Sequence, residues 1–188
     1  FPPPLNSNKT ETMKVGIEIP YNIDRGWLNL AIESVEKQTY PQQNIKLILS
    51  KSDNGVSYNL NRGVESLRDS DIIRYLCEDD TLTEDSIEAT VNYFKNNPEV
   101  DFIHSKAHNR FNNGKQIEWI PDYEEPSLES MLSHNRLHGG TVAYRSKVFE
   151  SNMFNETLWT GEEYEFNMRL LKQGYKIGYL NHITYIYR

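Results

Sequence analysis

The chain has 188 residues and a single cysteine, Cys77, so no disulfide can form within it. A lone cysteine is typical of a reducing compartment, and we expect a cytoplasmic location. The sequence also lacks an apolar run of membrane-spanning length and a signal-peptide pattern at its start. It has no basic excess either, because the net charge is −7, which argues against a nucleic-acid partner.

Several common site motifs are absent. There is no G-x-G-x-x-G, no G-x-x-x-x-G-K-[ST] and no H-E-x-x-H, which disfavours dinucleotide oxidoreductases, P-loop enzymes and common zinc proteases. Two histidine pairs have the i, i+4 spacing of zinc ligands, His104 with His108 and His134 with His138. Neither pair has a cysteine nearby, so we do not expect zinc.

Residues 1–12 are polar and proline-rich without periodicity, and we interpret them as a disordered tail or an expression remnant. Residues 13–188 are long enough for one domain with a complete hydrophobic core. The last predicted strand runs to Arg188. The chain is therefore also consistent with a piece cut from a longer polypeptide that has further domains.

The hydrophobic periodicity predicts an α/β protein. In the first half, strands and helices alternate, with strands at 13–20, 45–49 and 71–76 and helices at 27–35, 56–67 and 86–94. Such alternation indicates a mostly parallel sheet with right-handed crossovers. The second half is less regular, with strands at 100–105, 141–144, 176–180 and 183–187, a hairpin at 111–120 and helices at 127–133 and 162–172. We expect a small antiparallel part there.

The first acidic cluster, Cys77-Glu78-Asp79-Asp80, directly follows a predicted strand. Open α/β sheets bind ligands at the carboxyl ends of their strands. Carboxylate oxygens suit Mg²⁺ or Mn²⁺ that bridges to substrate phosphates. A solvated acidic turn is the alternative, and it is the commoner origin of such a run taken alone.

A second acidic pair, Glu162-Glu163, follows Gly161 at the start of a predicted helix. Acids in a first helical turn stabilise the helix dipole. A partly buried carboxylate at this place could also serve as a general base. Two acidic clusters in one α/β domain indicate transfer chemistry on a phosphorylated donor.

The order of several short motifs is similar to that of the GT-A-fold glycosyltransferases of family 2, the inverting group that uses nucleotide-diphosphate sugars. The resemblance covers nearly all of residues 13–188. The segments that carry it are VGIEIPYN at 15–22, SVEKQTY at 34–40, NGVS at 54–57 with NRG at 61–63, CEDDTL at 77–82, HGGT at 138–141 with RSKVF at 145–149, GEEYEFNMRL at 161–170 and GYKIGYL at 174–180.

The resemblance implies the GT-A fold, with helices on both faces of the sheet, and a role in polysaccharide or glycan biosynthesis. It implies transfer of a sugar from a nucleotide-diphosphate donor, with UDP the common nucleotide of the family, to a hydroxyl of a glycan or other acceptor. Single displacement would invert the anomeric centre, and Mn²⁺ or Mg²⁺ would assist.

The resemblance also implies roles for individual residues. Glu163, with Glu162 beside it, stands where the family has its catalytic base, and Asp79, with Asp80 and Glu78, stands at the metal motif. Trp159, just before the base helix, is expected to stack on the acceptor, with a core or lid aromatic as the alternative. The implied nucleotide and donor contacts are Pro20, Tyr21, Asn22, Asp53, Asn54, Arg62, Glu78, Asp79, Gly139 and Gly140.

Three departures from the family pattern keep other functions open. Cys77 replaces the first Asp of the metal motif, the D-D-G-S turn after the second strand is missing, and the base is Glu163 rather than Asp. One alternative is a catalytically inactive module that binds nucleotide sugars or glycans. Another is a nucleotidyltransferase on a related fold, although the glycine- and lysine-rich phosphate loop expected for it near the first strand is absent.

Overall fold

The computed structural model describes residues 12–188, so all but the last residue of the expected tail lies outside the described residues. The strands are β1 (Val15–Tyr21), β2 (Ile45–Lys51), β3 (Ile72–Tyr75), β4 (Thr81–Leu82), β5 (Phe102–Arg110), β6 (Gln116–Trp119), β7 (Ala143–Arg145) and β8 (Ile177–Tyr187). The α-helices are α1 (Leu28–Glu36), α2 (Val56–Ser66), α3 (Ser86–Asn96), α4 (Leu128–Met131) and α5 (Glu162–Lys172). Short 3₁₀ segments lie at Gln42–Asn44, Gly139–Thr141 and Ser146–Glu150.

The strands form one mixed sheet in the order β2-β1-β3-β7-β5-β8-β4, with β6 paired to β5. The parallel pairings β1–β2, β1–β3 and β5–β8 contain most of the paired residues, which confirms the predicted mostly parallel sheet. The antiparallel contacts all involve the strands from β4 onward. The expected antiparallel part of the second half is therefore confirmed too.

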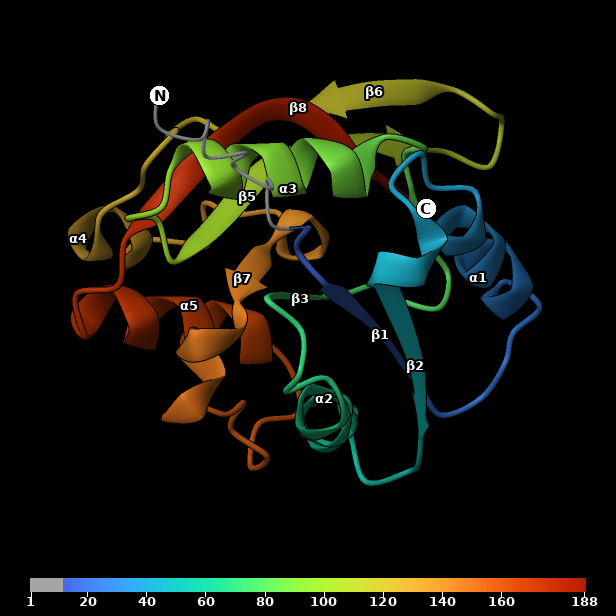
Figure 1. Cartoon of the computed structure of the whole chain (residues 1–188), viewed down its shortest axis with the longest axis horizontal. Coiled ribbons are helices and arrows are strands. Elements are labelled where there is room, and N and C mark those ends of the chain that lie inside the picture. Colours follow the sequence, from blue (N-terminus) through green and yellow to red (C-terminus); the bar gives the residue numbers. More distant parts are fainter. Residues whose placement is uncertain (1–11) are drawn as a thin grey trace, which may run out of the picture.

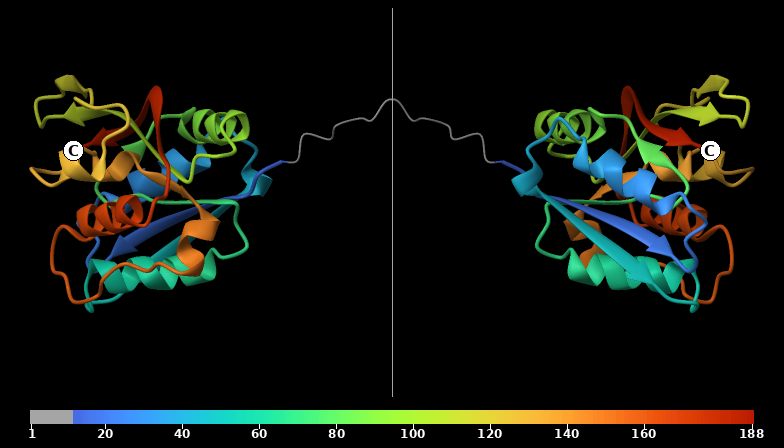
Figure 2. Two further views of the ribbon diagram at one scale, coloured as in Figure 1. Left: turned by 90° about the vertical axis from the view of Figure 1, so that its left-hand side faces the viewer. Right: turned by 90° about the vertical axis from the view of Figure 1, so that its right-hand side faces the viewer.

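Helices cover both faces of this sheet (Figure 1). Apolar residues of α1 and α3, such as Ala31, Val35 and Val91, pack on one face together with Val15 and Ile17 of β1. Residues of α2 and α5 pack on the other face. The side views place α2 along β1 and β2, with α3 on the opposite side of these strands (Figure 2). The two faces therefore have separate hydrophobic cores.

The second half differs in detail from the prediction. The strands expected at 176–180 and 183–187 are one strand, β8, whose pairing with β5 shifts register around Lys106. The irregularity lets a single strand continue past Asn181-His182. Strand β4 was not predicted, because two residues are too few to show a period. The hairpin between β5 and β6 is confirmed, with Gly114 in the left-handed region at its turn (φ +81°).

The longest described helices have 11 residues. Within residues 12–188, no helix has both the length and the apolar composition required to cross a bilayer.

Candidate active site

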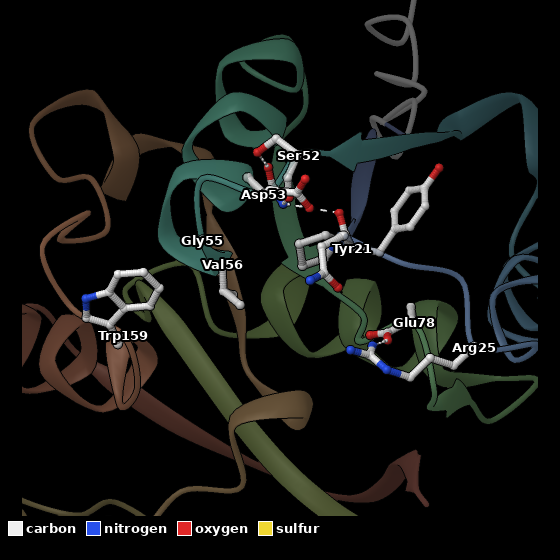
Figure 3. A pocket seen from close by; sticks show the side chains of 11 residues that line it. Tyr21, Arg25, Ser52, Asp53, Gly55, Val56, Glu78 and Trp159 are labelled. Atoms are coloured by element: carbon white, nitrogen blue, oxygen red, sulfur yellow. Dashed lines mark hydrogen bonds and ion pairs between the residues drawn. The ribbon is translucent and has the colours of Figure 1, made fainter.

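A cleft of about 350 Å³ lies where β1 and β2 end and α2 begins. This is the carboxyl edge of the parallel strands, the expected ligand edge of such a sheet. The structure brings six of the predicted site residues together here (Figure 3). They are Pro20, Tyr21, Asn22, Asp53, Glu78 and Trp159. The other residues that line the cleft are Arg25, Ser52, Gly55, Val56 and Asn59, which the sequence analysis did not select.

A small hydrogen-bond network shapes the loop after β2, where the D-D-G-S turn is missing. The buried amide of Asn59 donates to the backbone oxygens of Tyr21 (3.3 Å) and Ser52 (3.2 Å). The Ser52 hydroxyl donates to Asn59 Oδ1 at 2.6 Å. These bonds connect the end of β1, the loop and α2. The loop that carries Asp53 into the cleft lining is therefore held in place by hydrogen bonds.

The cleft contains one ion pair, between Arg25 Nη1 and Glu78 Oε1 at 2.6 Å. The Arg25 side chain is 57% exposed, whereas that of Glu78 is 15% exposed. Arg25 is the only lysine or arginine among the residues of 12–188 that line the cleft. In the sequence, Arg25 could have been selected from its position three residues after the Pro20-Tyr21-Asn22 turn.

The acids that follow β3 have three different environments. Asp80 is buried, and its oxygens accept hydrogen bonds from Tyr185 Oη (2.7 Å) and the Arg188 backbone N–H (2.8 Å). Burial raises the pKa of Asp80 to about 6. Burial also raises the pKa of the Cys77 thiol to about 12, so it is a protonated thiol at neutral pH. Within residues 12–188, no hydrogen bond or ion pair reaches the Asp79 carboxylate.

The three predicted metal ligands therefore differ in availability. Asp80 connects β3 to β8, Glu78 is paired with Arg25, and Asp79 is free among the described residues. Residues 12–188 contain no cluster of three or more His, Cys, Asp or Glu arranged to hold a metal ion. A single carboxylate fits the way Mg²⁺ binds through one or two carboxylates plus substrate phosphates and water. It does not fit a closed cage made by the protein alone.

Glu163 lies in the first turn of α5, against Gly139. A Cβ atom at Gly139 would come within 2.9 Å of both Glu163 Cγ and Tyr75 Oη. Burial raises the pKa of Glu163, and the neighbouring charge of Glu162 adds to the rise. A carboxylate with a raised pKa is better suited to accept a proton near neutral pH. A second cluster of candidate site residues thus forms where Glu163 and Tyr75 lie beside Gly139. Tyr75 comes from β3, and the other two come from the second half of the chain.

Five of the predicted donor contacts do not line the cleft: Asp79 and Gly139, described above, and Gly140, Arg62 and Asn54. A Cβ atom at Gly140 would come within 2.2 Å of the Tyr185 ring, so this glycine is needed for core packing. The Arg62 guanidinium pairs with Glu65 at 3.0 Å and does not line the cleft. Asn54 also lies outside the lining, and its backbone N–H donates to Ser52 Oγ.

Trp159 stands at the side of the cleft opposite the Arg25–Glu78 pair, next to Gly55 and Val56 (Figure 3). Its side chain is 93% exposed. An indole that projects into solvent at the mouth of a cleft has little packing function in the free protein. Its position favours contact with whatever the cleft binds.

No family model matches the chain, and no curated protein matches it in sequence. Solved structures do match in fold. The crystal structure of S. aureus TarS superposes with a TM-score of 0.76 at 15% identity, over 93% of this chain and 36% of that one. S. aureus TarS 1–349 in complex with UDP-GlcNAc gives a TM-score of 0.75 at 14% identity, over 93% of this chain and 58% of that one.

The mannosyltransferase PcManGT from Pyrobaculum calidifontis, in complex with GDP-Man and Mn²⁺, gives a TM-score of 0.69 at 12% identity. That match covers 94% of this chain and 57% of PcManGT. The chain therefore spans about 36% to 58% of the length of these three solved chains. They are GT-A-type glycosyltransferases, so the chain has the GT-A fold that the sequence analysis expected.

Proposed function

We propose that the protein transfers a sugar from a nucleotide-diphosphate donor to a hydroxyl acceptor. The observation that carries this proposal is the assembly of six predicted residues in one cleft at the carboxyl edge of a GT-A sheet. The bound molecules of the structural neighbours, UDP-GlcNAc and GDP-Man, are of the same class. UDP is our first choice of nucleotide, from the sequence resemblance.

The nucleotide occupies the 350 Å³ cleft in this proposal. Pro20, Tyr21 and Asn22 form one wall, and Asp53 accepts hydrogen bonds from the base or ribose. Trp159 lies in the lining together with them, so we assign its exposed ring to the ligand in this cleft. Its predicted acceptor role requires the acceptor to approach along the same side.

The chemical step requires a base for the acceptor hydroxyl, and we assign this role to Glu163. Its carboxylate accepts the proton while the acceptor oxygen attacks the anomeric carbon. The bond from that carbon to the diphosphate oxygen breaks, and its electron pair leaves with the diphosphate. Attack from the side opposite the leaving group inverts the anomeric centre.

A divalent cation, when bound, would neutralise negative charge that develops on the leaving diphosphate. Asp79 would hold it, and Glu78, whose Oε1 pairs with Arg25, is the second carboxylate that could join. Asp80 instead fixes the loop that presents Asp79, because its oxygens are occupied by Tyr185 and Arg188.

The test is release of nucleoside diphosphate from UDP- and GDP-sugars, with Mn²⁺ and with excess chelator. The wild-type protein is expected to release it slowly to water and faster with a suitable acceptor. Glu163→Gln is expected to slow release by roughly 10²–10⁴-fold while nucleotide binding persists. Glu165→Gln is the matched control, because Glu165 lies in the same helical turn but pairs with Arg169 at 2.8 Å. Equal loss in both variants would contradict the assignment of Glu163.

A second candidate is a binding module that has lost turnover. Cys77 replaces a carboxylate, and Asp80 is held by hydrogen bonds. This function predicts saturable nucleotide-sugar binding with no release of product in wild type or either variant. The same assay therefore separates the two candidates.

A further inference from the structure

We propose that Arg25 binds the diphosphate of the donor and that Glu78 is its partner only in the empty cleft. This inference rests on the proposed function and adds a residue that the sequence pattern did not select. Arg25 is the only basic residue in the described lining, whereas Asp53 and Glu78 are both acidic. A diphosphate that enters this cleft has one basic side chain to meet.

The other basic side chains near the cleft are engaged with other groups. Lys51 lies over the Tyr21 ring, with Nζ 5.8 Å from its centroid. Arg188 lies over the Trp27 ring, and its Nε donates to the Asp79 backbone oxygen at 3.2 Å. Arg62 pairs with Glu65 outside the lining. None of these residues replaces Arg25 as the cation of the lining.

The geometry leaves Arg25 free to exchange partners. Only Nη1 contacts Glu78, and no other described residue bonds to the guanidinium, so its remaining N–H groups can meet a second acceptor. Arginine binds phosphate through two parallel N–H donors, which a lysine cannot reproduce. With 57% of its side chain exposed, Arg25 forms a weak ion pair, because water screens such a contact.

The backbone around Arg25 presents its side chain without fixing it in a helix or strand. Asn22 Oδ1 accepts a hydrogen bond from the Ile23 N–H, and Asp24 Oδ1 accepts one from the Gly26 N–H. Gly26 has a φ of +91°, in the left-handed region. This shape holds the backbone between β1 and α1 in a defined turn while the guanidinium can rotate from Glu78 to a ligand.

The experiment is isothermal titration of wild-type protein and variants in excess chelator, so that Arg25 acts without a metal ion. The ligands are UDP and GDP, each with its nucleoside as the matched ligand without phosphate. Arg25→Ala is expected to weaken diphosphate binding at least 10-fold and to change nucleoside binding less than 2-fold. Arg25→Lys is expected to restore part of the loss. Arg68→Ala, at an exposed arginine outside the lining, is the matched control, and it is expected to bind like wild type.

Glu78→Gln gives a change of opposite sign. It removes a carboxylate beside the diphosphate and releases Arg25, so binding in chelator is expected to tighten several-fold. Equal binding of diphosphate by wild type and Arg25→Ala would overturn the inference and leave the proposed function intact. Equal loss for nucleoside and diphosphate would also overturn it, because Arg25 would then only support the fold. Absence of all nucleotide binding by wild type in chelator would overturn the inference, and its absence with Mn²⁺ as well would overturn both.

Discussion

The two halves of the molecule contribute to the site in different ways. The first half, β1 through β3, places cleft residues at the ends of neighbouring parallel strands, so their proximity follows directly from the local β-α-β order. The second half places Glu163 beside Gly139 and Tyr75 through contacts between residues far apart in the sequence. Apart from Trp159, the nucleotide side is therefore built from local structure, whereas the reacting side depends on long-range packing.

The acidic side chains at the candidate site show the same difference in burial. Glu78 and Asp53 line the open cleft of the first half. Asp80 is buried beneath the contact with β8, where Tyr185 reaches it from 105 residues away. Substitutions in the first half are expected to change binding, and those at the long-range contacts are expected to change stability and turnover together.

The largest expected effect concerns the reacting side. Glu163→Gln removes the proposed base, and general base catalysis contributes roughly 10²–10⁴-fold to a rate. The rate of nucleoside-diphosphate release should fall by that factor, while the dissociation constant for the nucleotide stays within about 3-fold, a loss of less than ~1 kcal/mol. Steady-state kinetics and titration on the same preparation check this. Equal losses of rate and of nucleotide affinity would contradict the separation between a binding side and a reacting side.

The next effect concerns Glu18, a buried carboxyl on β1 that lies against Gly63 of α2. Burial raises its pKa from 4.5 to about 9. The folded protein thus keeps a proton that the unfolded chain releases above pH 4.5, so this group's contribution to stability is complete below that pH and is lost as pH rises towards 9.

Glu18→Gln should remove this pH dependence. A difference of a few pKa units corresponds to a few kcal/mol, at about 1.4 kcal/mol per unit. Denaturant unfolding of wild type and variant between pH 5 and pH 9 checks this, at roughly one-unit steps. Parallel stability curves across that range would show that Glu18 ionises normally in the folded protein.

A smaller effect is expected from Gly140→Ala. The added Cβ would lie 2.2 Å from the Tyr185 ring and would displace the residue that holds Asp80. Overpacking of this kind costs about 1–3 kcal/mol of unfolding free energy. Thermal unfolding measures the loss, and Gly114→Ala, in the exposed β5–β6 turn with nothing near its Cβ, is the comparison for backbone strain alone. A smaller loss for Gly140→Ala than for Gly114→Ala would contradict the packing role.

The smallest effect is expected from Trp159→Phe. If the exposed indole contacts the bound nucleotide, a smaller aromatic ring should weaken binding only a few-fold, which is less than about 1 kcal/mol. Nucleotide should also quench the fluorescence of the wild-type protein more than that of the variant. Unchanged quenching would place the ligand away from Trp159 and favour its predicted role towards the acceptor.

Much of the fold could be predicted from the sequence because the periodic elements are local. Helix α5 begins and ends at the predicted residues, and α2 and β1 agree to within two residues at each end. The merging of two predicted strands into β8 could not be predicted, because pairing with β5 holds them together.

The candidate site was predictable where a motif fixes the backbone, as with Pro20, Tyr21 and Asn22. It was not predictable where side chains meet across the fold. Tyr185 donates a hydrogen bond to Asp80 across a sequence separation of 105 residues, and Arg25 pairs with Glu78 across 53 residues. These two contacts determine which of three adjacent acids is free.

The most direct test of the account is titration of the wild-type protein and of Val56→Trp with UDP- and GDP-sugars. Val56 lines the cleft and is 48% exposed, so a larger ring there fills the cleft without entering the core. We predict saturable binding by the wild-type protein, a similar affinity for Val56→Ala and at least a 10-fold loss for Val56→Trp, about 1.4 kcal/mol. Unchanged binding by a folded Val56→Trp variant, or no binding by wild type, would contradict it.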